Sequence, residues 1–148
     1  MEEVKMYKTN FITLVNSYND DEDSLDLIET NMNNLNGYVS AVYAMEVQIQ
    51  TLRFRLEGED YREAVTNLDK RRRNAHEAAI AACSILNRMA NLAGVEPLYS
   101  GNLEDRNEVA EFCIAIVDEL FHGRSRCTVR ELLEELKLFL QKYYNFVL

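Results

Sequence analysis

The chain has 148 residues, of which 47% are hydrophobic and 28% are charged, and its formal net charge is −9. This length suits one domain with a single hydrophobic core, so we expect one domain over residues 1–148. The acidic net charge disfavours nonspecific binding to nucleic acid or to anionic membranes, because the long-range field repels phosphate groups.

The amino-terminal segment and the cysteines predict a reduced, cytoplasmic protein. The opening Met-Glu-Glu-Val-Lys is acidic and lacks the apolar stretch of a signal peptide. No segment approaches the roughly 20 uninterrupted apolar residues of a membrane span. Cys83, Cys113 and Cys127 are odd in number and lack metal-binding spacing, and the first two lie in apolar helical patterns. We therefore expect no membrane association, no metal and no cofactor.

The first half of the chain predicts two helices. Apolar residues at helical spacing indicate a first helix over about 2–18, followed by an acidic turn at 19–23 that leaves Asp23 or Ser24 to cap the next helix. A spacing of three and four then continues over about 25–56. Several weak helix formers surround Gly37, so we expect a kink or short break there.

The second half predicts two or three more helices. A turn at 57–60, with Gly58 in a left-handed conformation, leads to a central helix over 61–93 that stops at Gly94. After a loop at 96–101, a further helix begins near Asn102 and ends at Gly123. No stretch alternates as a strand does, so we expect an all-α, up-and-down antiparallel bundle of four to five helices.

The last predicted helix, over about 128–147, begins with the capping box Thr128-Val-Arg-Glu131. Apolar and aromatic residues cover more than half of its circumference, which exceeds the single stripe that a surface helix needs. We favour a homodimer or protein-partner contact through this helix. The alternative is that it packs over the first helix.

A polar cluster, Asp69-Lys-Arg-Arg-Arg-Asn-Ala-His76, leads directly into an alanine-rich apolar run of the central helix. Spacing by three or four puts Asp69, one arginine and His76 on one helix face. Antiparallel neighbours would bring Glu46 level with this cluster from the preceding helix, and the end of the following helix from the other side. The candidate anion-binding residues are Arg71, Arg72, Arg73, His76, His122, Arg124 and Arg126.

This cluster supports four interpretations. Arginines beside a histidine could bind a phosphate or carboxylate, or could cleave RNA without a metal, with histidine transferring the proton. His76, His122 and Glu46 could bind a metal. In the structural interpretation, which we favour, Arg72 or Arg73 pairs with Glu46 or Asp69 and the other arginines are solvated. Farther along, Arg88 or Arg106 is expected to pair with Glu108 or Glu111.

More specific catalytic signatures are lacking. The chain contains no glycine-rich phosphate loop, no zinc spacing and no nucleophile elbow. The small number of lysines and the acidic charge argue against DNA binding of the helix-turn-helix type.

The spacing Arg71-x-x-x-x-His76 resembles the Arg-x(4–6)-His motif of the HEPN family, small all-α proteins that include RNA-cleaving toxins. The resemblance implies metal-independent RNA cleavage by His76 with Arg71.

A broader resemblance spans about residues 38–126 and covers most of the chain. Its residues are Tyr61-x3-Val65-x3-Asp69-x2-Arg72-Arg73-x2-His76, Ile80, Leu86-Asn87-Arg88, Gly94, Tyr99-x-Gly101, Arg106-x2-Val109-Ala110-x-Phe112 and Phe121-x2-Arg124. They resemble a family of small uncharacterised bacterial proteins known only as a domain of unknown function. The resemblance implies a bacterial, cytoplasmic helical protein and no particular activity. We therefore favour a non-enzymatic interaction protein, with an anion-binding or RNA-cleaving site as the alternative.

Overall fold

The computed structural model describes residues 6–121, together with residues 131 and 134. The described chain forms the helices α1 (Met6–Ser17), α2 (Glu22–Arg55), α3 (Gly58–Ala93) and α4 (Arg106–Phe121). The prediction of an all-α bundle is confirmed, and residues 6–121 contain no strand. Within the part described, no helix combines the length and the apolar character needed to cross a bilayer. Most of the predicted helix at 128–147 lies outside the described residues.

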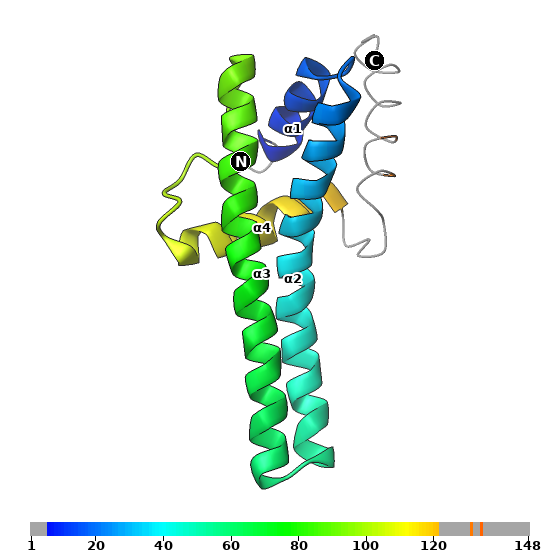
Figure 1. The fold of residues 1–148 in the computed structure, drawn as a ribbon, viewed down its shortest axis with the longest axis vertical. Coiled ribbons are helices and arrows are strands. Elements are labelled where there is room, and N and C mark those ends of the chain that lie inside the picture. Colours follow the sequence, from blue (N-terminus) through cyan, green and yellow to red (C-terminus); the bar gives the residue numbers. More distant parts are fainter. Residues whose placement is uncertain (1–5, 122–130, 132–133, 135–148) are drawn as a thin grey trace.

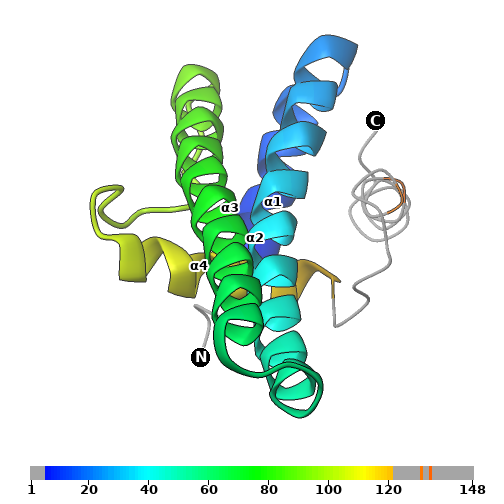
Figure 2. The same cartoon turned by 60° about the horizontal axis from the view of Figure 1, so that its bottom comes forward.

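Helices α2 and α3 form one long antiparallel hairpin, and the two short helices pack against only one half of it (Figure 1). Helix α1 lies beside the half that contains the start of α2 and the end of α3. Helix α4 lies across the hairpin near its middle, a crossing that is also visible after rotation (Figure 2). It contacts all three other helices.

The helix ends follow local capping chemistry. Asp21, rather than Asp23 or Ser24, caps α2, because its side chain accepts the backbone N–H of Ser24. Gly94 ends α3 as predicted, with φ +71° and its N–H directed at the last carbonyls of the helix. Asp105 caps α4 by accepting the N–H of Glu108.

The kink expected near Gly37 does not occur, because α2 runs unbroken from Glu22 to Arg55. Leu35, Tyr38 and Val39 on either side of the glycine are all buried. Burial of these side chains outweighs the roughly 1 kcal/mol by which a glycine disfavours a helix interior.

The hydrophobic core occupies only half of the hairpin. The last buried residue of α2 is Ala41 and the first of α3 is His76. We call residues 42–75 the tip, and residues 6–41 and 76–121 the base. No residue of the tip is buried. At about 1.5 Å of rise per residue, the end of α2 stands about 21 Å beyond the last buried residue.

The two helices of the tip are held together by a single seam of half-buried side chains. The side chains recur at intervals of three and four along each helix, which is the pattern of a two-stranded coiled coil. The seam consists of Val42, Met45, Ile49 and Leu52 from α2, of Leu56 directly after α2, and of Tyr61, Val65, Leu68, Arg72 and Ala75 from α3. Outside this seam, only Ala44, Ala64 and Asp69 of the tip are half-buried, and the other residues of the tip are exposed.

Candidate functional site

The arginines next to Asp69 in α3 are paired with it. Arg72 Nη2 and Arg73 Nε lie 2.9 and 3.0 Å from the two carboxylate oxygens of Asp69. The hydrogen bond from Arg72 holds the pKa of the Asp69 carboxyl below its usual value, and the same bond raises the pKa of Arg72. One carboxylate thus serves two guanidinium groups. Glu46 is exposed on α2, and the ion pairs formed within the described residues do not include it.

His76 joins three helices at the boundary between base and tip. The residue is only 7% exposed, and its ring packs against Tyr38 of α2 with the ring centroids 4.7 Å apart. Its Nε2 lies 3.0 Å from the carbonyl oxygen of Arg106, at the start of α4. A carbonyl only accepts, so Nε2 carries the hydrogen in this contact. His76 therefore ties α3 to α4 and packs against α2.

This contact corrects the expected register of α4. An antiparallel α4 would have brought its end, near residue 121, level with His76. The structure places its start there instead, because α4 crosses the hairpin (Figure 1). His122, Arg124 and Arg126 lie outside the described residues.

We expect His76→Ala to lower the free energy of unfolding by about 1–3 kcal/mol, because the change removes a buried hydrogen bond and a packed ring. Urea denaturation followed by circular dichroism measures the loss. Asn74→Ala, at an exposed position of the same helix, should change stability by less than about 0.5 kcal/mol. Equal midpoints for the two variants would contradict a structural role of His76.

The remaining candidates do not form a common site with His76 in the described structure. Arg71 is exposed, and five residues of helix place it about 140° around α3 from the buried His76. No group of three or more metal-ligating side chains occurs within the residues that the structure describes. The potential ligands Glu46 and His76 are an exposed and a buried side chain on different helices.

The loop between α3 and α4 is held by a polar network that the sequence did not reveal. Asn87 of α3 donates to the Tyr99 carbonyl at 2.8 Å and accepts the Tyr99 N–H at 3.4 Å. The Tyr99 hydroxyl lies 2.7 Å from the Asn102 carbonyl oxygen and 3.0 Å from Glu108 Oε1. Glu108 also accepts the Asn102 N–H. A side chain at Gly101 would collide with the Glu108 carboxylate and the Tyr99 ring, which explains the glycine there.

Arg106 does not form the ion pair that the sequence predicted for it. Its guanidinium contacts Glu77 of α3, and not Glu108 or Glu111. Glu108 is engaged with the loop, while the crossing of α4 directs Arg106 toward the middle of α3. The Arg106–Glu77 ion pair is thus a second contact between α3 and α4, one residue after the contact made by His76.

Tyr99 gives the loop network a pH dependence. Burial, followed by the nearby Glu108 carboxylate, raises the pKa of Tyr99 well above its usual value near 10. The neutral form is favoured in the folded state, so this stabilisation is complete below pH 10 and is lost as the pH rises above it. We expect the alkaline loss of stability to be shallower in Tyr99→Phe, by up to about 1.4 kcal/mol per pH unit. Urea denaturation between about pH 8 and pH 11 measures this, and parallel curves for wild type and variant would contradict it.

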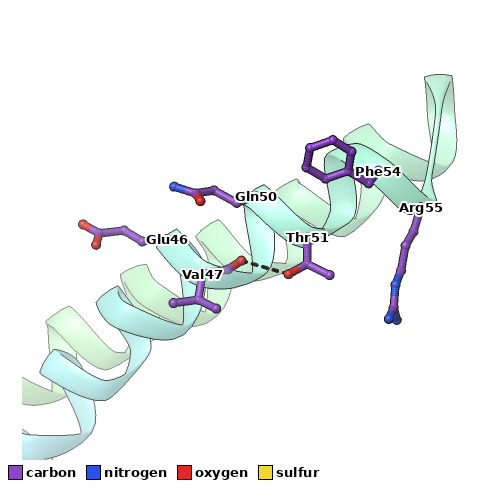
Figure 3. A pocket seen from close by; sticks show the side chains of 6 residues that line it. All are labelled: Glu46, Val47, Gln50, Thr51, Phe54 and Arg55. Atoms are coloured by element: carbon purple, nitrogen blue, oxygen red, sulfur yellow. Dashed lines mark hydrogen bonds between the residues drawn. The ribbon is translucent and has the colours of Figure 1, made fainter.

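The exposed apolar surface of the tip is the second candidate site. Phe54, Val47 and Tyr43 are 92%, 65% and 59% exposed. With Gln50 they follow one another at intervals of four, three and four, so they lie on one stripe along α2. We call these four residues the α2 stripe. Part of it lines an open groove of about 510 Å³, whose lining side chains all come from α2 (Figure 3).

The spacing of these apolar residues in the sequence is the signal for this stripe, which the prediction of contact residues above did not include. Met45, Ile49 and Leu52 form the half-buried stripe on the face toward α3. A second heptad stripe on the opposite face indicates a helix with partners on two sides. Two other pockets are lined in part by Tyr99 and by residues of the hairpin turn, respectively. His76 lines neither of them.

Comparison with known proteins places the chain in a family without assigning an activity. The model of a family described as "Protein of unknown function (DUF3232)" matches residues 2–126. No curated protein and no solved structure shows a significant match to the chain. The geometry of the tip and of the polar cluster is therefore the basis for a functional assignment.

Proposed function

The chain belongs to DUF3232, a family of proteins of unknown function, and we propose that it acts as a non-enzymatic helical interaction protein of the bacterial cytoplasm. The tip of the α2–α3 hairpin is its contact surface. The apolar face of the predicted helix at 128–147 supports the same kind of function.

The α2 stripe carries this proposal. A folded monomer gains nothing in stability from a phenylalanine that is 92% exposed, and two further large apolar side chains are exposed on the same stripe. Clusters of exposed apolar side chains mark contact surfaces on soluble proteins. The tip extends beyond α1 and α4 (Figure 1), so a partner can reach Val47 and Phe54 without rearranging the core.

The polar cluster favours this proposal over anion binding or RNA cleavage. Asp69 already neutralises part of the charge of Arg72 and Arg73. The Nε2–H of His76 is directed at a backbone carbonyl, while Arg71 lies on a different, exposed face of α3. A phosphate would have to displace these contacts before binding several of the groups together.

Site-specific photocrosslinking in the native host tests the function. A benzophenone amino acid at position 54 should yield discrete protein adducts on irradiation. The same probe at Arg62, exposed on the α3 side of the tip, should yield fewer. Equal and diffuse crosslinking at both positions would contradict a contact surface on α2.

A further inference from the structure

We propose that the partner of the α2 stripe is a second copy of this chain. In this arrangement α2 pairs with α2 of the second copy in antiparallel orientation and joins the two molecules at their tips. The inference rests on the proposed function and names its partner. It is carried by the spacing, the symmetry and the charges of the residues on the outer face of α2.

The stripe has the period of a coiled coil. Intervals of four, three and four from Tyr43 to Phe54 match alternating d and a positions of a heptad. The side chains that face α3, such as Ile49 and Leu52, occupy the c and f positions on the other side. One helix thus carries two seams, one for α3 and one that no described residue fills.

The stripe is also complementary to itself. In an antiparallel pair centred between residues 48 and 49, Tyr43 lies level with Phe54 of the second copy, and Val47 lies level with Gln50. Each large aromatic side chain then meets another aromatic ring, and the smaller side chains meet near the twofold axis. Aromatic pairs of this kind are favourable beyond the area that they bury. A symmetric dimer requires this kind of self-complementarity.

Charges flanking the stripe support the same alignment. Glu46 and Arg53 lie one heptad apart on one flank, at positions that face each other in antiparallel coiled coils. Glu46 of one copy therefore meets Arg53 of the other, and the contact occurs twice. The opposite flank carries the small residues Ala44 and Thr51, which allow the helices to approach closely. Within one copy, Glu46 and Arg53 are both exposed and do not pair with each other.

The distribution of charge allows two acidic chains to meet at this surface. The base carries fourteen acidic and three basic residues, whereas the tip carries six acidic and seven basic residues. Much of the stripe lies beyond the end of the core, at distances that exceed the Debye length of about 8 Å at physiological ionic strength. Repulsion between the two bases is screened over that distance, and the nearly neutral tips can associate.

The area that the α2–α2 contact would bury predicts a reversible dimer. The exposed parts of Tyr43, Val47 and Phe54 amount to roughly 400 Å² per copy, comparable with the largest apolar patch of a typical monomer. Two such patches with their flanks reach about 1,000 Å², the lower limit for a specific interface. We therefore expect dissociation in the micromolar range.

Charge exchange in the full-length chain tests the arrangement. Sedimentation equilibrium from about 1 to 200 µM should show a monomer–dimer equilibrium for wild type, weakened by about tenfold or more in Glu46→Arg and in Arg53→Glu. An equimolar mixture of the two variants should regain wild-type association, because every cross-copy pair is then again of opposite charge. Circular dichroism confirms that the variants fold, and Arg62→Glu is a control on the α3 side of the tip that should associate like wild type.

Some outcomes overturn the proposal. Wild type that remains monomeric over the whole range contradicts it, as does a dimer that neither charge exchange weakens or a mixture that does not recover. If the purified chain is monomeric while position 54 crosslinks to a different protein in cells, the contact surface stands and the homodimer fails. If both experiments are negative, the proposed function fails with it.

Discussion

Replacing Phe11 with alanine is expected to lower the free energy of unfolding by about 3–5 kcal/mol, whereas the same replacement at Phe54 should change it by less than about 0.5 kcal/mol. Phe11 is completely buried where α1 packs on the hairpin, while Phe54 is 92% exposed at the tip. The two positions lose the same atoms, so the difference measures burial alone. Urea denaturation below about 1 µM, where a reversible dimer dissociates, gives both values.

The Phe54→Ala result separates stability from association. If the phenylalanine serves a contact, the variant should unfold like wild type at low concentration and lose the extra stability that wild type gains at high concentration. A loss above about 2 kcal/mol at low concentration would show that Phe54 belongs to a hydrophobic core.

The second large effect is expected at Asn87. Its carboxamide bonds both the N–H and the carbonyl of Tyr99, and Tyr99 is nearly fully buried. Alanine would leave two backbone groups without partners, so we expect a loss of about 2–3 kcal/mol. Denaturation monitored by the tyrosine near-ultraviolet circular dichroism signal measures it.

Asn91 supplies the matched control for this experiment. It lies one turn farther along α3 with an exposed side chain, and Asn91→Ala should leave stability within about 0.5 kcal/mol of wild type. Equal effects at the two positions would mean that loss of asparagine from the helix, rather than loss of the Tyr99 contacts, determines the result.

Periodicity predicted the helices because the apolar face of each helix is recorded in its own sequence. The end of α3 was predictable from Gly94, since the left-handed conformation is a local property of the residue. The break at Gly37 was wrong because a local propensity was opposed by burial of neighbouring side chains, a tertiary effect.

The candidate site was predictable only where its contacts are local. Asp69 and Arg72 are three residues apart in one helix, so their spacing alone brings them together. The contact of His76 with Arg106 depends on the direction in which α4 crosses, and α4 follows a loop whose path is set by Asn87 and Tyr99. Nothing in the periodicity of α4 encodes that direction.

The absence of buried residues between Ala41 and His76 also divides the molecule thermodynamically. Helices held by a single half-buried seam open at a lower free energy than helices packed against a core, so amide hydrogens of the tip should exchange with solvent through local openings that leave the base folded. The protein then has two stabilities, one for each half of the same pair of helices. Contact at the α2 stripe would slow exchange in the tip alone, so a partner would stabilise the half of the hairpin that has no buried core of its own.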